Sequence, residues 1–233
     1  NFYPSLMSLK KNIIQLFSFL VLLWFAFQSF EVQRPVIKQN SDLRITDFNY
    51  SKAIENLKQF TEEPHYTGSE KSTVVREYLV GELKKLGLKV ELQEGIAWSK
   101  ANRRATRPTN IIAKLPATNP TDSTKSLMLM THYDSAMHSS PGASDAGSGV
   151  VTILESLRAF LASDPNFTND ILVVFTDSEE IGLLGAQLFV DNYQNLDQVA
   201  MVLNFEARGS GGRSYMFMET PDSNASLLRL FKK

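Results

Sequence analysis

Short apolar runs separated by polar segments are the main pattern in this chain. Three uninterrupted runs have the length and composition of strands buried on both faces of a parallel sheet: residues 127–130, 171–175 and 199–203. Three further segments also predict strands, by alternation or apolar content: residues 89–93, 110–115 and 215–218.

Between these predicted strands, several segments carry apolar residues at the spacing of a helix. The pattern predicts helices at about residues 51–60, 69–86, 150–162 and 179–193. Ser51 can cap the first helix and Gly87 ends the second. Because strands that alternate with helices are typical of layered α/β domains, we expect a three-layer sandwich around a mixed, mainly parallel central sheet.

The N-terminal residues have a different pattern. Residues 12–30 carry no charge and are almost wholly apolar, with Lys10 and Lys11 before them and Glu31 after them. A segment of roughly 20 such residues suits a transmembrane helix, and the paired lysines predict a cytoplasmic N-terminus. A cleaved signal peptide is the competing interpretation, but residues 26–29 show no clean small-x-small cleavage site. We therefore expect an uncleaved anchor.

These patterns divide the chain into four parts. We expect a cytoplasmic N-terminus at residues 1–11, the transmembrane anchor at 12–30, a polar linker at 31–50 and a folded domain at 51–233. The domain would lie on the non-cytoplasmic side of the membrane, in the periplasm, the extracellular space or a lumen. Residues 226–233 read as the opening of an amphipathic helix, which predicts a domain truncated at its C-terminus.

Composition narrows the chemistry. The chain has 233 residues, 43% of them hydrophobic, and a net charge of −1, so nothing in its electrostatics predicts a nucleic-acid partner. We interpret the basic cluster at residues 100–107 as a solvated loop. Cysteine is absent, which excludes disulfides, thiolate zinc sites and a catalytic thiol. A metal would have to be held by His, Asp and Glu.

Such residues follow the predicted strands, where α/β sheets place their ligand sites. His132 and Asp134 come directly after the first apolar run. Alternate residues of an extended chain point the same way, so Asp134 can orient the imidazole of His132. Asp145 lies in a loop rich in glycine and serine, which permits close backbone approach, although such loops are usually plain turns.

Three more carboxylates follow the other two runs. Glu179 and Glu180 open a predicted helix, where adjacent side chains project about 100° apart, so one can bind metal while the other transfers a proton. The helix macrodipole alone would also explain this pair. Glu206 follows the third run, where an unpaired carboxylate is costly to bury, so it meets a metal or pairs with Arg208. This arrangement of residues is typical of a zinc hydrolase.

The remaining histidines and serines fit less well. His138 lies in a loop, and His65 lies between two predicted helices far upstream, so we expect neither to bind metal and His65 to have a structural or rim role. Neither Ser144 nor Ser148 stands in a Gly-x-Ser-x-Gly elbow, and no later histidine completes a triad.

In their order along the chain, these motifs resemble the M28 family of metallopeptidases, aminopeptidases with two co-catalytic zinc ions. The resemblance covers about residues 48–230 and rests on five specific segments: 64–69, 131–135, 142–145, 177–186 and 204–207. The apolar N-terminal segment and residues 204–212 are most similar to the membrane-bound branch, that is, endoplasmic reticulum and vacuolar M28 peptidases and their bacterial relatives.

The resemblance implies a set of metal ligands. His132 and Glu206 would bind one zinc ion, Glu180 the other, and Asp145 would bridge the two. It also implies a cis peptide bond between Asp145 and Ala146. This chain has Ala at position 146, where relatives often carry Asn or Asp.

The resemblance also implies the catalytic roles. Glu179 would be the general base, which takes a proton from the attacking water and returns it to the leaving amine, and Asp134 would orient His132. The family's last zinc ligand is a histidine late in the domain, and no histidine follows His138 here. We therefore expect this fragment to bind zinc poorly and to show little activity.

The sequence thus predicts a membrane-anchored zinc exopeptidase that acts on peptides with a free N-terminus. A glutaminyl cyclase-like acyltransferase is an alternative, because it shares the fold and a similar ligand set but works with one zinc ion. A receptor-type ectodomain without metals is a third possibility, and the joint presence of the acidic and imidazole residues argues against it.

Overall fold

A computed structural model describes residues 6–34, 42–101, 103–137, 139–207, 209, 211, 214–219 and 229. The chain divides into two compact units, Asn40–Ser210 on the one hand and Asn1–Gln39 with Gly211–Lys233 on the other. His138, Arg208 and most of the helix predicted at residues 226–233 lie outside the described residues.

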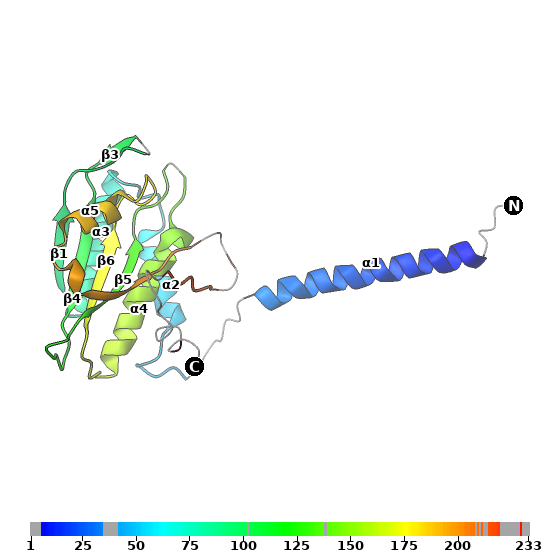
Figure 1. The fold of residues 1–233 in the computed structure, drawn as a ribbon, viewed down its shortest axis with the longest axis horizontal. Helices are drawn as coiled ribbons and strands as arrows, with labels where there is room; N and C mark the ends of the chain where they lie inside the picture. Colours follow the sequence, from blue (N-terminus) through cyan, green and yellow to red (C-terminus); the bar gives the residue numbers. More distant parts are fainter. Residues whose placement is uncertain are drawn as a thin grey trace. The chain divides into compact units, whose positions relative to one another are not determined.

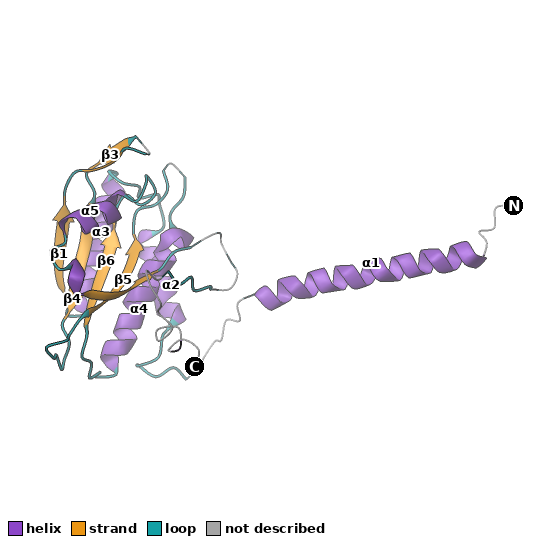
Figure 2. Ribbon diagram, in the orientation of Figure 1, coloured by secondary structure: helices purple, strands orange, loops and turns teal. Residues whose placement is uncertain are grey.

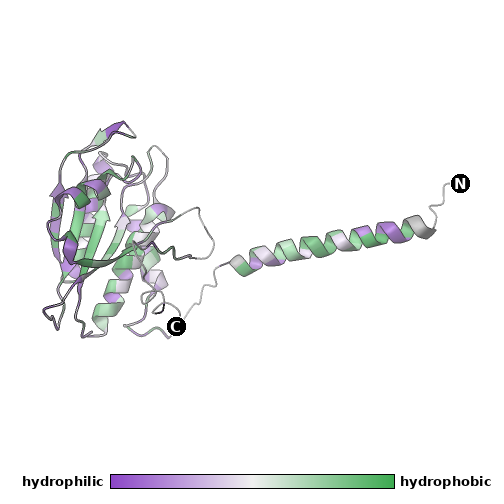
Figure 3. Ribbon diagram, in the orientation of Figure 1, coloured by the Kyte–Doolittle hydropathy of each residue, from purple (hydrophilic) through white to green (hydrophobic). Residues whose placement is uncertain are grey.

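The N-terminal unit contains one long apolar helix, α1 (Leu6–Gln33). Within it, Leu9–Val32 is long and apolar enough to cross a membrane, with a mean hydropathy of 1.9. Hydrophobic positions recur along most of its length, and large side chains such as Phe17 and Leu22 are exposed (Figure 3). The predicted helix is therefore confirmed, and its composition suits either a membrane span or a signal sequence.

The larger unit is built on a five-stranded mixed sheet in the order β1-β4-β6-β5-β7 (Figure 1). Its strands are β1 (Lys89–Glu94), β4 (Thr109–Leu115), β5 (Ser126–His132), β6 (Asp170–Thr176) and β7 (Val199–Asn204). β5 pairs in parallel with β6 and with β7, whereas β4 is antiparallel to both of its neighbours. Only β4 therefore runs against the common direction, and the expected mixed, mainly parallel sheet is confirmed.

Helices cover both faces of this sheet, which gives the three expected layers (Figure 2). The helices are α2 (Tyr50–Phe60), α3 (Glu70–Lys85), α4 (Ser148–Ala162) and α5 (Leu184–Asn192). Alternate strand residues separate into two buried clusters, because successive side chains of a strand point to opposite faces. Val173 and Phe175 pack with residues of α2, α3 and α4, whereas Leu172 and Val174 pack with Phe189 of α5.

Local signals account for most helix boundaries. Asn49 and Ser69 cap α2 and α3, each accepting a hydrogen bond from a backbone N–H three residues later. At the end of α3, Gly87 adopts a φ of 82°, in the left-handed region that glycine favours. Two short helical segments complete the unit, a π-helical turn η1 (Ala143–Gly147) and a 3-10 turn η2 (Leu196–Gln198).

Five sequence predictions differ from the structure. Asn49, and not Ser51, caps α2. β7 was expected to be buried on both faces, but it is a sheet edge in which half-buried and exposed residues alternate. The helix predicted from residue 179 begins only at Leu184, because positive φ values at Ser178 (61°) and Leu183 (60°) interrupt a helical path. Residues 215–218 form no strand, since a strand needs a hydrogen-bonded neighbour and none of the described residues pairs with them. The basic segment at residues 100–107, interpreted as a solvated loop, is exposed, but it is not wholly a loop. It contains β3 (Arg104–Thr106), which pairs with β2 (Ala97–Ser99).

Candidate metal centre

The parallel strands bring the candidate residues to one edge of the sheet. β5 ends at His132, whose side chain is buried, and Glu179 and Glu206 follow the ends of β6 and β7. Asp145 approaches from the π-helical turn η1, ahead of α4. Since β5, β6 and β7 run in the same direction, their carboxyl ends meet at this edge, as the sequence pattern indicated.

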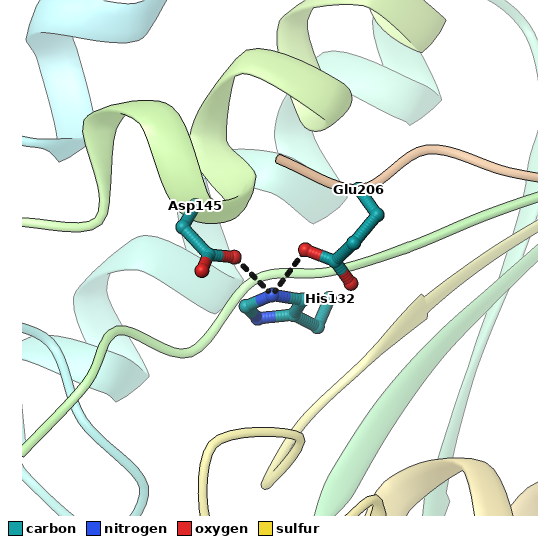
Figure 4. A group of neighbouring side chains, drawn as sticks. All are labelled: His132, Asp145 and Glu206. Atoms are coloured by element: carbon teal, nitrogen blue, oxygen red, sulfur yellow. Dashed lines mark hydrogen bonds and ion pairs between the residues drawn. The ribbon is translucent and has the colours of Figure 1, made fainter. Parts of the chain in front are cut away.

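Three of these side chains form a compact donor group. The Nε2 atom of His132 lies 3.0 Å from Oδ1 of Asp145 and 3.6 Å from Oε1 of Glu206 (Figure 4). One ligand atom from each residue lies within 4.8 Å of the other two. Imidazole nitrogen and carboxylate oxygens are ligands that zinc takes in proteins, so the donor set fits this metal.

The imidazole ring is oriented by Asp134, as the sequence spacing predicted. Nδ1 of His132 lies 3.0 Å from the backbone carbonyl oxygen of Asp134 and 3.4 Å from its Oδ1 atom. An Nδ1–H donated to Asp134 leaves Nε2 free to face Asp145 and Glu206.

Asp134 has a second contact that the sequence did not indicate. Its Oδ1 atom accepts a hydrogen bond of 3.0 Å from the backbone N–H of Glu179, and its Oδ2 atom accepts one of 3.3 Å from that of Glu180. The side chain is only 1% exposed, so these bonds are shielded from water. Asp134 therefore couples the ring of His132 to the turn that presents both glutamates.

A buried network behind this turn was also missed. Oγ1 of Thr67 lies 3.3 Å from Oδ2 of Asp134 and 3.0 Å from Oδ1 of Asp177. The other carboxylate oxygen of Asp177 accepts a hydrogen bond from the backbone N–H of Thr109. The backbone N–H of Asp177 donates a hydrogen bond to Oδ1 of Asn110. Thr67 and Asp177 belong to the motifs at residues 64–69 and 177–186, but their spacing in sequence does not predict that they meet.

Glu179 and Glu180 have different positions in the site. Oε2 of Glu179 lies 3.9 Å from Nε2 of His132, beside the donor group. Glu180 is not part of that group, but it lines an adjacent cavity of about 450 Å³ together with Glu179 and Arg104. Burial raises the pKa of both glutamates, and the negative charge of Asp145 raises that of Glu180 further.

Without a metal, the charged groups of the donor group shift one another's pKa values strongly. Burial disfavours the charged form of His132, but its contacts with Asp134 and Glu206 dominate and raise its pKa to about 11. Burial likewise opposes ionisation of Glu206, yet the hydrogen bond with His132 lowers its pKa to about 2. The pKa of Asp145 is raised by burial and by Glu206. A cation that binds here competes with the proton for the imidazole of His132.

His65 has the structural role expected of it. It is 1% exposed, its backbone N–H donates to Oγ of Ser135 at 2.9 Å, and its Nδ1 lies 3.1 Å from the carbonyl oxygen of Glu63. Burial lowers its pKa. Its ring also packs edge-on against Phe60, which fixes the segment between α2 and α3.

Comparison with known proteins decides the family. The peptide bond between Asp145 and Ala146 is cis, as the resemblance implied. The model of peptidase family M28 matches residues 110–233. The chain belongs to peptidase family M28. Its sequence relatives include vacuolar membrane proteases of Vanderwaltozyma polyspora, 37% identical over 118 residues, and of Saccharomyces cerevisiae, 36% identical over 119 residues. Each alignment covers 51% of the M28 chain and 12% of the relative.

Solved structures similar to the M28 chain include zinc-dependent exopeptidases and glutaminyl cyclases. A zinc-dependent exopeptidase from Parabacteroides distasonis is 26% identical with a TM-score of 0.55, and the match covers 65% of this chain and 58% of that one. A glutaminyl cyclase from Tannerella forsythia is 25% identical with a TM-score of 0.58, covering 70% and 63% of the two chains. The zinc-exopeptidase-like fold is thus confirmed.

Proposed function

We propose that this chain carries the catalytic centre of a zinc-dependent aminopeptidase. The observation that carries the proposal is the donor group of His132, Asp145 and Glu206, whose ligand atoms lie within 4.8 Å of one another. The carboxylate of Glu179 stands beside it, 3.9 Å from Nε2 of His132. A cluster of carboxylates with one imidazole is electrostatically costly without a cation, which supports a metal at this point.

His132 and Glu206 would hold one zinc ion, Asp145 would bridge to a second ion, and Glu180 would hold that second ion. When zinc is bound, it lowers the pKa of a water molecule and polarises the carbonyl of the substrate. Glu179 takes the proton of the attacking water and returns it to the leaving amine, and burial has already raised its pKa towards the value that such a base needs.

The membrane arrangement belongs to the same proposal. Residues 12–30 anchor the protein, residues 1–11 lie in the cytoplasm, residues 31–50 form a linker, and residues 51–233 belong to the peptidase domain on the other side. The apolar character of α1 and the lysines before it support this topology. Protease protection of sealed membranes tests it, because digestion of the domain by protease added to the cytoplasmic face would contradict the orientation.

The activity test is release of free amino acids from unblocked peptides by the complete natural gene product loaded with zinc. Glu179→Gln keeps the size of the side chain but removes the base, and we expect kcat to fall at least about 100-fold. Glu77→Gln is the matched control, since Glu77 is exposed on α3, and it should leave the rate unchanged. Full activity of Glu179→Gln would exclude the proposed role of Glu179.

A glutaminyl cyclase is the second candidate, supported by the fold likeness to the Tannerella forsythia enzyme. Its product would be a peptide that begins with pyroglutamate, formed without release of an amino acid and with one zinc ion for each chain. Mass spectrometry of a peptide with N-terminal glutamine separates the two activities, because cyclisation loses ammonia whereas hydrolysis shortens the peptide. A protein that does neither after zinc loading would favour a receptor-type domain.

A further inference from the structure

The basic segment at residues 100–107 is not accounted for by the proposed chemistry. Its basic residues are exposed, as expected of a solvated loop, but residues 104–106 form β3, which pairs with β2. In this hairpin Ala97 pairs with Thr106, Trp98 with Ala105 and Ser99 with Arg104. Ala97 is 4% exposed and packs against Leu184 and Leu188 at the start of α5. One face of the hairpin is therefore held against the domain.

The pairing places Arg104 on that same face. Ala97 and Ser99 share a face because alternate residues of a strand point the same way, and directly opposed residues of an antiparallel pair lie on the same side. Arg104, opposite Ser99, therefore shares the face of Ala97 but is itself exposed, whereas Trp98 lies on the other face and is 65% exposed.

On that side, Arg104 lines the 450 Å³ cavity whose other lining residues are Glu179, Glu180, Gly182 and Leu183. Its guanidinium makes no ion pair or side-chain hydrogen bond with any residue that the structure describes. A planar guanidinium donates in a geometry that fits a carboxylate, and cavities of this size hold small peptides.

We propose that Arg104 binds a carboxylate of the peptide substrate and so directs the enzyme towards short or acidic peptides. The inference rests on the proposed peptidase function. Arg104 is the one cationic residue among the described residues that line the cavity, so it is the residue there that can receive a carboxylate.

Two sources of this carboxylate are distinguished by the choice of substrate. The dipeptide Ala-Ala carries a C-terminal carboxylate, which is absent from its amide, Ala-Ala-NH2. Ala-Glu-NH2 carries only a side-chain carboxylate, which is replaced in Ala-Gln-NH2. The kcat and KM of the zinc-loaded, complete gene product are measured for all four peptides.

The variant is Arg104→Gln, and its matched control is Arg103→Gln, which removes the same charge from the same hairpin at a residue that does not line the cavity. For at least one acidic peptide we expect Arg104→Gln to lower kcat/KM about tenfold, mainly through KM, with a change below about twofold on the matching neutral peptide. Arg103→Gln should change neither value by more than about twofold, and Arg104→Lys should restore part of the loss.

Equal losses on acidic and neutral peptides would overturn the proposal, because Arg104 would then act on the glutamates and not on the substrate. No loss on either acidic peptide would also overturn it. If the wild type cleaves none of the four, the aminopeptidase proposal fails, and titration calorimetry of the same peptides decides the role of Arg104. Tighter binding of an acidic peptide that Arg104→Gln abolishes would support the role, and equal or absent binding would refute it.

Discussion

Gly185 is the residue where the packing behind the catalytic turn can be tested most directly. It lies in the first turn of α5, and its carbonyl oxygen accepts a hydrogen bond of 2.8 Å from Nδ2 of Asn110. A methyl group added here would collide with the carbonyl oxygen of Asp177 and would lie 2.6 Å from Oδ1 of Asn110. Gly185→Ala must therefore displace Asp177, Asn110 or the start of α5.

The structure sets the size of the effect. Overpacking in a well-packed interior costs about 1–3 kcal/mol, and a buried polar group left without its partner costs about 1–3 kcal/mol more. Replacement of a helical glycine by alanine gains back roughly 1 kcal/mol. These contributions sum to about 1–5 kcal/mol, and we expect Gly185→Ala to lower the free energy of unfolding by a value near the middle of this range, about 2–4 kcal/mol. We expect kcat/KM to fall as well, because Asp177 helps to hold the turn of Glu179.

Urea unfolding followed by circular dichroism measures this change. With a slope of about 2 kcal/mol/M, the midpoint should fall by roughly 1–2 M without a change in slope. Gly81→Ala is the control, since Gly81 lies inside α3 with no atom within 4 Å of an added methyl group, and it should raise the stability by up to about 1 kcal/mol. If Gly185→Ala is as stable as Gly81→Ala, the close packing of α5 on Asp177 is wrong.

Three further changes test other parts of the structure. Asp134→Asn loses a carboxylate that holds both His132 and the catalytic turn, so zinc affinity measured by competition with a chelator should fall about 10–100-fold, and unchanged affinity would contradict this role. Leu79→Ala removes a fully buried side chain and should cost about 2–5 kcal/mol in urea unfolding, whereas the exposed Val74→Ala should stay within about 0.5 kcal/mol, and equal costs would refute the assigned core. Removal of zinc with a chelator should lower Tm in the wild type but not in His132→Ala, and an equal shift in both would place the metal elsewhere.

Much of the fold follows from local features of the chain. The apolar run at residues 171–175 is a strand buried on both faces, because such burial requires uninterrupted hydrophobic residues, and the run at 127–130 forms a largely half-buried strand beside it. α3 runs from the cap at Ser69 to the glycine at 87, as these two residues predicted. The positions of His132 and Glu206 after parallel strands were sufficient to predict that their side chains share one edge of the sheet.

Contacts between distant segments depend on the tertiary structure. Thr67 reaches Asp177 across 110 residues, and neither residue belongs to a periodic pattern that could reveal the contact. The turn of Glu179 is not helical, because Asp134 binds its backbone N–H and the chain takes up positive φ values nearby, whereas acidic residues in sequence favour a helix start.

The place of Arg104 in the cavity also depends on contacts between distant segments, whereas the candidate residues that the sequence identified follow from local patterns. Hydrophobic periodicity acts between near neighbours, so it can be read from the chain, and it predicts which elements form and which of their faces are buried. The side of a hairpin on which an arginine lies depends on register and on packing against α5, that is, on contacts whose partners lie roughly 90 residues apart in the chain. The basic segment is exposed, as composition indicated, but only the folded domain places one of its arginines, Arg104, at the edge of the cavity.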